Sequence, residues 1–394
     1  MKYVVLIVDG AAGLPMPDKN NKTCLELAKT PNLDALAKQA TLGLARTVPP
    51  GMEPGSAVAC MSVMGYNPAV YYGGRAAIEA ASMGIGVGEG ESVFRCNLVN
   101  TAGGVMADYS GGHITTEEAA EIIKTLNKEL GRDDIMFFPG VNYRHLLKLE
   151  GREETLKAKC TPPHDISGKP IKDFLPQGTG KELLLDLMAR SKAVLKSHKI
   201  NAARVKRGLV PITNIWLFWG CGRVPAMPSF KKTYGLNAAM TSAVDLLKGL
   251  AKMASVDILE IKGITDGPDN DYAGQAAGAI KALDNHDLVV IHIEAPDEAG
   301  HGGRADEKIK AIEDIDSYVV AQMRNYAGDL RVLVMPDHPT PIKLRTHTGD
   351  PVPFLVWGKG IKANGAARFT EAEGKKTGNY IPDGYKIMES FLTE

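Results

Sequence analysis

Short apolar runs alternate along much of the chain with longer segments whose apolar residues recur at helical spacing. Runs rich in Val, Ile and Leu predict strands buried on both faces of a parallel sheet, and the longer segments predict helices. Alternation of this kind is typical of an α/β fold with helices on both faces of the sheet. The predicted strands cover residues 3–8, 43–48, 256–261, 288–293, 332–335 and 353–357. One predicted helix begins at Pro31, and the others cover residues 57–64, 236–253, 272–284 and 305–325.

The alternation is interrupted between residues 76 and 225. A chain of 394 residues is longer than a typical single domain. We therefore expect a main domain formed by residues 1–75 and 226–394, with a smaller α/β domain of residues 76–225 inserted into it. The inserted stretch contains predicted helices at 115–130 and 181–198 and predicted strands at 135–138, 143–149 and 214–219.

Composition narrows the classes of function. Lys plus Arg and Asp plus Glu each number 46, so the balanced charge argues against a nucleic-acid surface but allows a local basic pocket for a small anion. No apolar run reaches the ~18 residues of a membrane span, and the chain opens on a strand instead of a leader sequence. The five cysteines are odd in number and never spaced Cys-x-x-Cys, which predicts neither a disulfide framework nor a zinc knuckle. This usage is typical of proteins from a reducing compartment. We expect a cytoplasmic protein without a membrane partner.

Acidic residues follow three of the predicted strands. Asp9, Asp297 and Asp337 each come directly or a few residues after an apolar run. The carboxyl ends of parallel strands share one edge of a sheet, where ligands bind in open α/β folds. Three carboxylates gathered there would repel one another, so we expect a cation. The imidazoles of His301, His338 and His347 can also bind a metal. Together with the carboxylates they provide more ligands than one metal ion needs, in a number that suits two.

Ser56 stands at the predicted start of the helix 57–64, after a turn rich in Pro and Gly. Free backbone N–H groups and the positive end of the dipole at a helix start favour an oxyanion or a phosphate. Two interpretations stay open for this residue. Ser56 is either an ordinary N-cap serine or, beside a metal ion that lowers the pKa of its hydroxyl, a nucleophile.

Several short motifs extend from one end of the chain to the other: Val8-Asp9-Gly10, Pro54-Gly55-Ser56, Gly65-Tyr66-Asn67-Pro68, Tyr71-Tyr72-Gly73-Gly74-Arg75, Phe94-Arg95-Cys96-Asn97, Pro296-Asp297-Glu298-Ala299-Gly300-His301, Pro336-Asp337-His338 and His347-Thr348-Gly349-Asp350-Pro351-Val352-Pro353. Together they resemble the alkaline phosphatase superfamily, and within it the cofactor-independent phosphoglycerate mutases of the archaeal type. The resemblance implies an alkaline phosphatase-like three-layer α/β/α sandwich with an inserted smaller α/β domain.

The same resemblance implies two divalent metal ions, usually Mn²⁺, with Mg²⁺ or Zn²⁺ as alternatives. The implied reaction interconverts 3-phosphoglycerate and 2-phosphoglycerate in two steps, through a phosphoserine at Ser56. Asp297, His301 and His347 would hold one ion. Asp9, Ser56, Asp337 and His338 would hold the other.

The small phosphorylated substrate carries a carboxylate and a phosphate, and guanidinium groups bind such oxyanions in bidentate fashion. The inserted domain is expected to supply cationic side chains that bind the substrate and keep water from the intermediate. The candidates for substrate contacts are Arg75, Arg95, Arg144, His145 and Arg204.

Two stretches depart from the mutase pattern. Ala57 follows Ser56 where the family commonly has an acidic residue, and residues 108–113 stand where the family has an arginine-rich clamp. Residues 108–113, 143–146, 161–165 and 336–341 instead resemble a bacterial branch provisionally called proposed homoserine kinases. The mutase is the leading hypothesis, a phosphotransferase acting on homoserine or another small alcohol is the alternative, and a phosphohydrolase is the third.

Overall fold

The chain divides into two compact units in the computed structural model, which describes residues 1–223 and 225–393. Met1–Tyr72 and Pro225–Glu394 form the first unit, and Gly73–Val224 form the second. This division lies close to the predicted domain boundaries. A chain that leaves one unit, builds another and returns indicates an insertion.

The first unit is built on one large sheet. Among the described residues it has eight strands, in the order β12 (Tyr380–Ile381), β2 (Thr41–Ala45), β11 (Val352–Gly358), β10 (Leu330–Met335), β1 (Lys2–Val8), β9 (Leu288–Ile293), β7 (Ala238–Thr241) and β8 (Asp257–Ile258). Strands β10, β1, β9, β7 and β8 are parallel, and all of them except β7 overlap predicted apolar strands. Strand β11 runs antiparallel to both β10 and β2, so the sheet is mixed.

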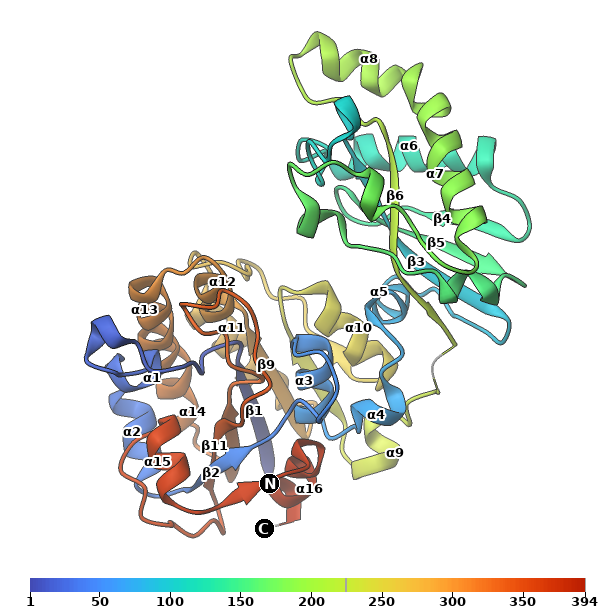
Figure 1. Ribbon diagram of the computed structural model, residues 1–394. Helices are drawn as coiled ribbons and strands as arrows, with labels where there is room; N and C mark the ends of the chain where they lie inside the picture. Colours follow the sequence, from blue (N-terminus) through green and yellow to red (C-terminus); the bar gives the residue numbers. More distant parts are fainter. Residues whose placement is uncertain (224, 394) are drawn as a thin grey trace. The chain divides into compact units, whose positions relative to one another are not determined.

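Helices cover both faces of this sheet, with α13, α14 and α2 on one side and α3 and α10 on the other (Figure 1). The predicted three-layer α/β/α sandwich is thereby confirmed. The α-helices of the first unit are α1 (Cys24–Leu27), α2 (Pro31–Ala37), α3 (Ser56–Val63), α4 (Pro68–Tyr71), α9 (Phe230–Tyr234), α10 (Asp245–Met253), α11 (Tyr272–Ala282), α12 (Ala295–His301), α13 (Ala305–Ile315), α14 (Ala321–Arg324), α15 (Glu371–Lys376) and α16 (Ile387–Thr393), with a π-helical turn at Asp316–Val320.

The predicted helix 236–253 is wrong over its first half. Residues 238–241 form strand β7, which pairs in parallel with β9, and only Asp245–Met253 is helical. The strand is short and contains two alanines, whose intrinsic preference is helical. Burial between neighbouring strands overrides that preference. The predicted strand 256–261 shrinks likewise to the two residues of β8.

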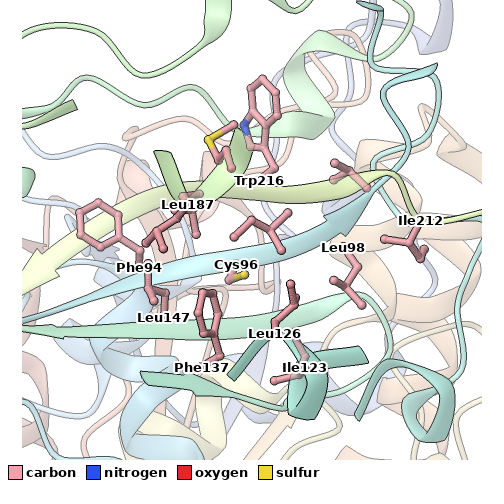
Figure 2. Packing of buried hydrophobic residues seen from close by; sticks show 14 of the residues in the cluster. Phe94, Cys96, Leu98, Ile123, Leu126, Phe137, Leu147, Leu187, Ile212 and Trp216 are labelled. Atoms are coloured by element: carbon pink, nitrogen blue, oxygen red, sulfur yellow. The ribbon is translucent and has the colours of Figure 1, made fainter. Parts of the chain in front are cut away.

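The second unit contains an antiparallel sheet in the order β4 (Ile135–Phe138), β5 (Arg144–Glu150), β3 (Glu91–Val99) and β6 (Asn214–Gly222). Helices α6 (Thr116–Leu130) and α7 (Lys181–Lys196) pack on one face, where Phe94, Cys96 and Leu98 point into an apolar core (Figure 2). Helix α5 (Arg75–Ser82) packs on the other face, against Val93. A further helix, α8 (Lys199–Lys206), follows α7.

Strand β3 was not predicted, because Arg95 and Asn97 interrupt its apolar sequence. The strand obeys an alternating pattern all the same, since Phe94, Cys96 and Leu98 share one face. Its opposite face therefore carries the two polar residues.

No helix within residues 1–223 and 225–393 is both long and apolar enough to cross a membrane.

Candidate active site

Three carboxylates meet at one edge of the large sheet. Asp9 follows β1, Asp337 follows β10, and Asp297 lies in the first turn of α12, which follows β9. Because β10, β1 and β9 are neighbours, the three side chains converge, and each is at most 3% exposed. The parallel strands therefore bring the three carboxylates to one edge of the sheet, as we expected from their positions after the apolar runs.

Asp9 lies at the centre of this group. Its Oδ2 accepts a hydrogen bond from His292 Nε2 at 2.7 Å, while its Oδ1 has no hydrogen-bond partner among the described residues. His292 is held in turn by Ser242, whose Oγ lies 2.9 Å from Nδ1. Burial, followed by the charges of Asp337 and Asp297, raises the pKa of Asp9 well above its ordinary value. A buried acceptor without a donor, among like charges, is the environment that a cation stabilises.

Asp337, His338 and Ser56 form the side of the site next to Asp9. His338 Nε2 lies 3.2 Å from Asp337 Oδ2 and 3.7 Å from Asp9 Oδ1. The Oγ of Ser56 lies 3.2 Å from the same Nε2. Burial lowers the pKa of His338, which favours the neutral imidazole that metal binding requires.

Asp297, His301 and His347 form the other side. His301 Nε2 lies 3.2 Å from Asp297 Oδ2 and 2.8 Å from His347 Nε2, and His347 Nε2 lies 3.6 Å from Asp297 Oδ1. Burial opposes the ionisation of Asp297, yet hydrogen bonds from both imidazoles hold its pKa well below the ordinary range. The hydrogen bond to Asp297 raises the pKa of His301 to about 9.

The two sides touch each other through His338. Its ring centroid lies 4.1 Å from that of His347, and the Oγ1 of Thr340 lies 3.3 Å from its Nδ1 while donating to Asp297. The ligand atoms of Asp9, Asp337 and His338 all lie within 4.8 Å of one another, as do those of Asp297, His338 and His347. Carboxylates and imidazoles in these adjoining groups fit divalent metal ions.

Ser56 is the first residue of α3, and its side chain does not cap the helix. Gly55 occupies the N-cap position, and the Ser56 Oγ is directed to His338 instead. Within the described residues, the backbone N–H groups of Ser56 and Ala57 donate no hydrogen bond. Of the two interpretations of Ser56, this geometry favours the nucleophile at a helix start that can receive an oxyanion.

Sequence reasoning missed three residues of this site. His292 orients Asp9, Thr340 links Asp297 to His338, and the Cys60 thiol lies 3.4 Å from Asp337 Oδ2. One signal was available for His292, because it is the only polar residue in the apolar run of β9. Thr340 and Cys60 carry no comparable signal, since their partners lie on distant segments.

Arg75, Arg95 and Arg144 gather on the face of the small sheet that α5 covers. Arg75 and Arg95 both pair with Glu79, and the proximity of Arg75 and Arg144 contributes to a lowered pKa of Arg95, after burial as the main cause. These three predicted substrate residues therefore form one cationic cluster.

The other two predicted substrate residues, Arg204 and His145, are buried within the second unit. The guanidinium of Arg204 is 1% exposed and donates to Glu118 at 2.5 Å and to the backbone oxygens of Val210 and Gly111. The pKa of His145 falls to about 3 because of burial and then Arg95, and its Nδ1 accepts from the Gly140 N–H. All three guanidinium nitrogens of Arg204 therefore donate to the chain itself, whereas the Nε2 of His145 has no hydrogen-bond partner among the described residues.

Comparisons with known proteins identify the family of the chain. Residues 37–201 match the family model of 2,3-bisphosphoglycerate-independent phosphoglycerate mutase. A protein of that name from Methanothrix thermoacetophila is 48% identical over all of both chains, and a probable one from Geobacter sulfurreducens is 45% identical over all of both chains. The structure of a cofactor-independent phosphoglycerate mutase from Thermoplasma acidophilum is similar with a TM-score of 0.68, at 25% identity, covering 100% of this chain and 99% of that one. The chain belongs to the family of 2,3-bisphosphoglycerate-independent phosphoglycerate mutases.

Proposed function

We propose that this protein interconverts 3-phosphoglycerate and 2-phosphoglycerate through a phosphoserine at Ser56. One observation carries the assignment: the Oγ of Ser56 lies 3.2 Å from His338 Nε2, inside the cluster of carboxylates and imidazoles. The names of relatives that match the full chain support the same reaction.

Two divalent cations, with Mn²⁺ as our choice, would occupy the cluster. Asp297, His301 and His347 would hold one, and Asp9, Ser56, Asp337 and His338 the other. When bound, such ions lower the pKa of a hydroxyl and offset the charge on phosphoryl oxygens. The unpartnered Oδ1 of Asp9 and the hydrogen bonds that hold Asp297 ionised support these assignments.

The residues of the chain account for the two transfer steps. Ser56 Oγ attacks the phosphorus of 3-phosphoglycerate, the bond from phosphorus to the substrate oxygen breaks, and that oxygen takes up a proton. The other hydroxyl of the retained glycerate then loses its proton and attacks the phosphoserine, which restores the Ser56 hydroxyl. The free N–H groups at the start of α3 suit the phosphoryl oxygens in both steps. No net proton is gained or lost.

The cationic cluster of the second unit is assigned to substrate binding. Arg75, Arg95 and Arg144 are planar, permanently charged groups of the kind that recognises carboxylates and phosphates. Their removal should raise the KM for phosphoglycerate.

A Ser56→Ala variant tests the nucleophile. The variant should fold and bind Mn²⁺ as the wild type does, yet lose isomerisation of 3-phosphoglycerate measured without added bisphosphoglycerate. Ser317→Ala, an exposed serine of the same unit, is the matched control and should stay active. Activity of Ser56→Ala near that of wild type would remove Ser56 from the mechanism.

Metal analysis tests the ligand assignments. Asp297→Ala and Asp337→Ala should each lower the Mn²⁺ content, whereas Asp306→Ala, whose side chain is 87% exposed, should not. Unchanged metal in both site variants would contradict the assignment.

The same preparation separates the alternatives. ATP-dependent phosphorylation of homoserine without isomerisation of phosphoglycerate would indicate the phosphotransferase. Release of inorganic phosphate as the main product would indicate a phosphohydrolase.

A further inference from the structure

Strand β6 contains a β-bulge at Trp219. Val93 of β3 pairs with Cys221 and Arg95 pairs with Phe218, so β6 contains one residue more than β3 across this interval. Trp219 adopts a left-handed backbone with φ 50°, which a bulky residue rarely does. Bulges of this kind re-aim a side chain, and strained residues of this kind concentrate at functional sites.

The bulge brings the indole of Trp219 against two arginines. The guanidinium carbon of Arg75 lies 4.9 Å from the ring centroid, and that of Arg95 lies 6.0 Å from it. The centroid of the His164 ring lies 5.6 Å from that of the indole, edge-on, and the centroid of the Phe218 ring lies 4.7 Å from it. Trp219 itself remains partly exposed. An aromatic face next to guanidinium groups stabilises their charge and restricts their rotation.

The two arginines keep donors available after their contacts with the chain. Glu79 accepts from the Nη1 of Arg95 and from the Nε of Arg75 at 3.2 Å, and Asn97 accepts from the Nε of Arg95 at 3.1 Å. Within residues 1–223 and 225–393, the Arg95 Nη2 and both terminal nitrogens of Arg75 donate no hydrogen bond, although Arg95 is 5% exposed. The Arg75 side chain is 41% exposed, and none of these arginine nitrogens is among the fully enclosed atoms that lack a partner, so the donors are open to a ligand with oxyanion character.

Arg144 adds a third cation to the same face. Its guanidinium carbon lies 5.8 Å from the ring centroid of Tyr143, and it has no carboxylate partner among the described residues. Arg144 lies close enough to Arg95 to contribute to the lowered pKa of Arg95, and Glu79 pairs only with Arg75 and Arg95. The excess positive charge of the three arginines fits a small oxyanion.

We propose that Trp219 is a positioning residue that holds Arg75 and Arg95 for binding an oxyanion of the phosphoglycerate substrate. The identity of this ligand rests on the proposed function. The bulge itself is strained, and a residue kept there against that strain is explained by the contact that its side chain makes. The indole also packs against the apolar core of the second unit, so a purely structural role predicts that its removal lowers the melting temperature and leaves KM unchanged.

Two substitutions remove the indole while keeping the backbone. Trp219→Gly and Trp219→Asn suit a φ of 50°, so relief of backbone strain should offset part of the packing that the indole loses, and both variants should fold. Their KM for 3-phosphoglycerate should rise about three- to thirtyfold, as expected for loss of a cation–π contact, with kcat less affected. Trp219→Phe should recover part of the affinity because it restores an aromatic face.

Trp357 provides the matched control. It lies in β11 of the first unit and is also partly exposed, so Trp357→Phe should leave KM unchanged. Binding of 3-phosphoglycerate to the full chain should also change the tryptophan fluorescence, and this change should be lost in Trp219→Phe and kept in Trp357→Phe.

Two competitive inhibitors identify the oxyanion. Glycerate carries only the carboxylate and glycerol 3-phosphate only the phosphate, and Trp219→Gly should weaken one of them. Wild type that neither isomerises nor binds phosphoglycerate would contradict the proposed function and the inference together. Active wild type with an unchanged KM and unchanged inhibition in both Trp219→Gly and Trp219→Asn would overturn the inference alone.

Discussion

Metal binding should displace a proton from His301. In the metal-free protein, the hydrogen bond to Asp297 raises the pKa of this imidazole from 6.5 to about 9. The pair therefore stabilises the metal-free fold below pH 6.5, and this contribution is lost as the pH rises through 9. A metal ion needs the neutral imidazole, so the proton opposes binding at neutral pH.

The size of the effect follows from this shift. Apparent metal affinity should rise about tenfold per pH unit while His301 is protonated and level off above its pKa. Between pH 7 and a pKa of about 9 this amounts to roughly a hundredfold. The side chain is 35% exposed, so solvent screening makes the hundredfold an upper bound.

Calorimetry of Mn²⁺ binding in buffers of different ionisation enthalpy counts the protons released. About one proton should leave His301 at pH 7, and its release should vanish above pH 9. His301→Gln should release about one proton fewer at pH 7, whereas His286→Gln, a histidine elsewhere in the same unit, should behave as wild type. The same proton count in His301→Gln and wild type would refute this account.

Three further predictions concern the surroundings of the site and the stability of the second unit. In Gly10→Ala the added Cβ would lie 2.5 Å from Asp297 Oδ1 at a φ of +60°, so we expect about 1–3 kcal/mol of destabilisation and a lower Mn²⁺ content. His292→Leu removes the donor to Asp9 and should weaken Mn²⁺ binding about ten- to a hundredfold in a metal titration. The pKa of His145 falls to about 3 on folding, so the unfolded chain takes up its proton first as the pH drops below 6.5. Denaturant unfolding should therefore show this histidine destabilising the protein by about 1.4 kcal/mol per pH unit between 6.5 and 3.

Matched variants separate these effects from general damage. Gly51→Ala imposes the same kind of left-handed strain in open space, so it should not alter the metal content. Equal metal loss in both glycine variants would contradict the proposed clash. His292→Gln can still donate to Asp9 and should keep most of the affinity that His292→Leu loses. His145→Asn should flatten the acid dependence of stability, and an unchanged slope would disprove the assignment to His145.

The sequence by itself determined the strands that deliver the carboxylates. An apolar run followed by an acidic residue is a local pattern, and parallel strands must bring such ends to one edge. Asp9, Asp297 and Asp337 could therefore be predicted to converge without knowledge of the strand order. The start of α3 at Ser56 was equally local, because it depends on a turn followed by an apolar helix.

Only the tertiary structure decided which side chains face one another. His292 meets Asp9 across 283 positions of the chain, and Arg204 meets Glu118 across 86. Such pairings cannot be predicted from the periodicity of the sequence. Arg204 was therefore predicted to contact the substrate, although its guanidinium is enclosed by the fold. The left-handed Trp219 is likewise invisible in the sequence, because the bulge exists only through the register of β6 against β3. The chemistry of each side chain and the local hydrophobic period can be derived from the sequence. Which side chains are buried and which pair with one another is decided only when distant segments pack together.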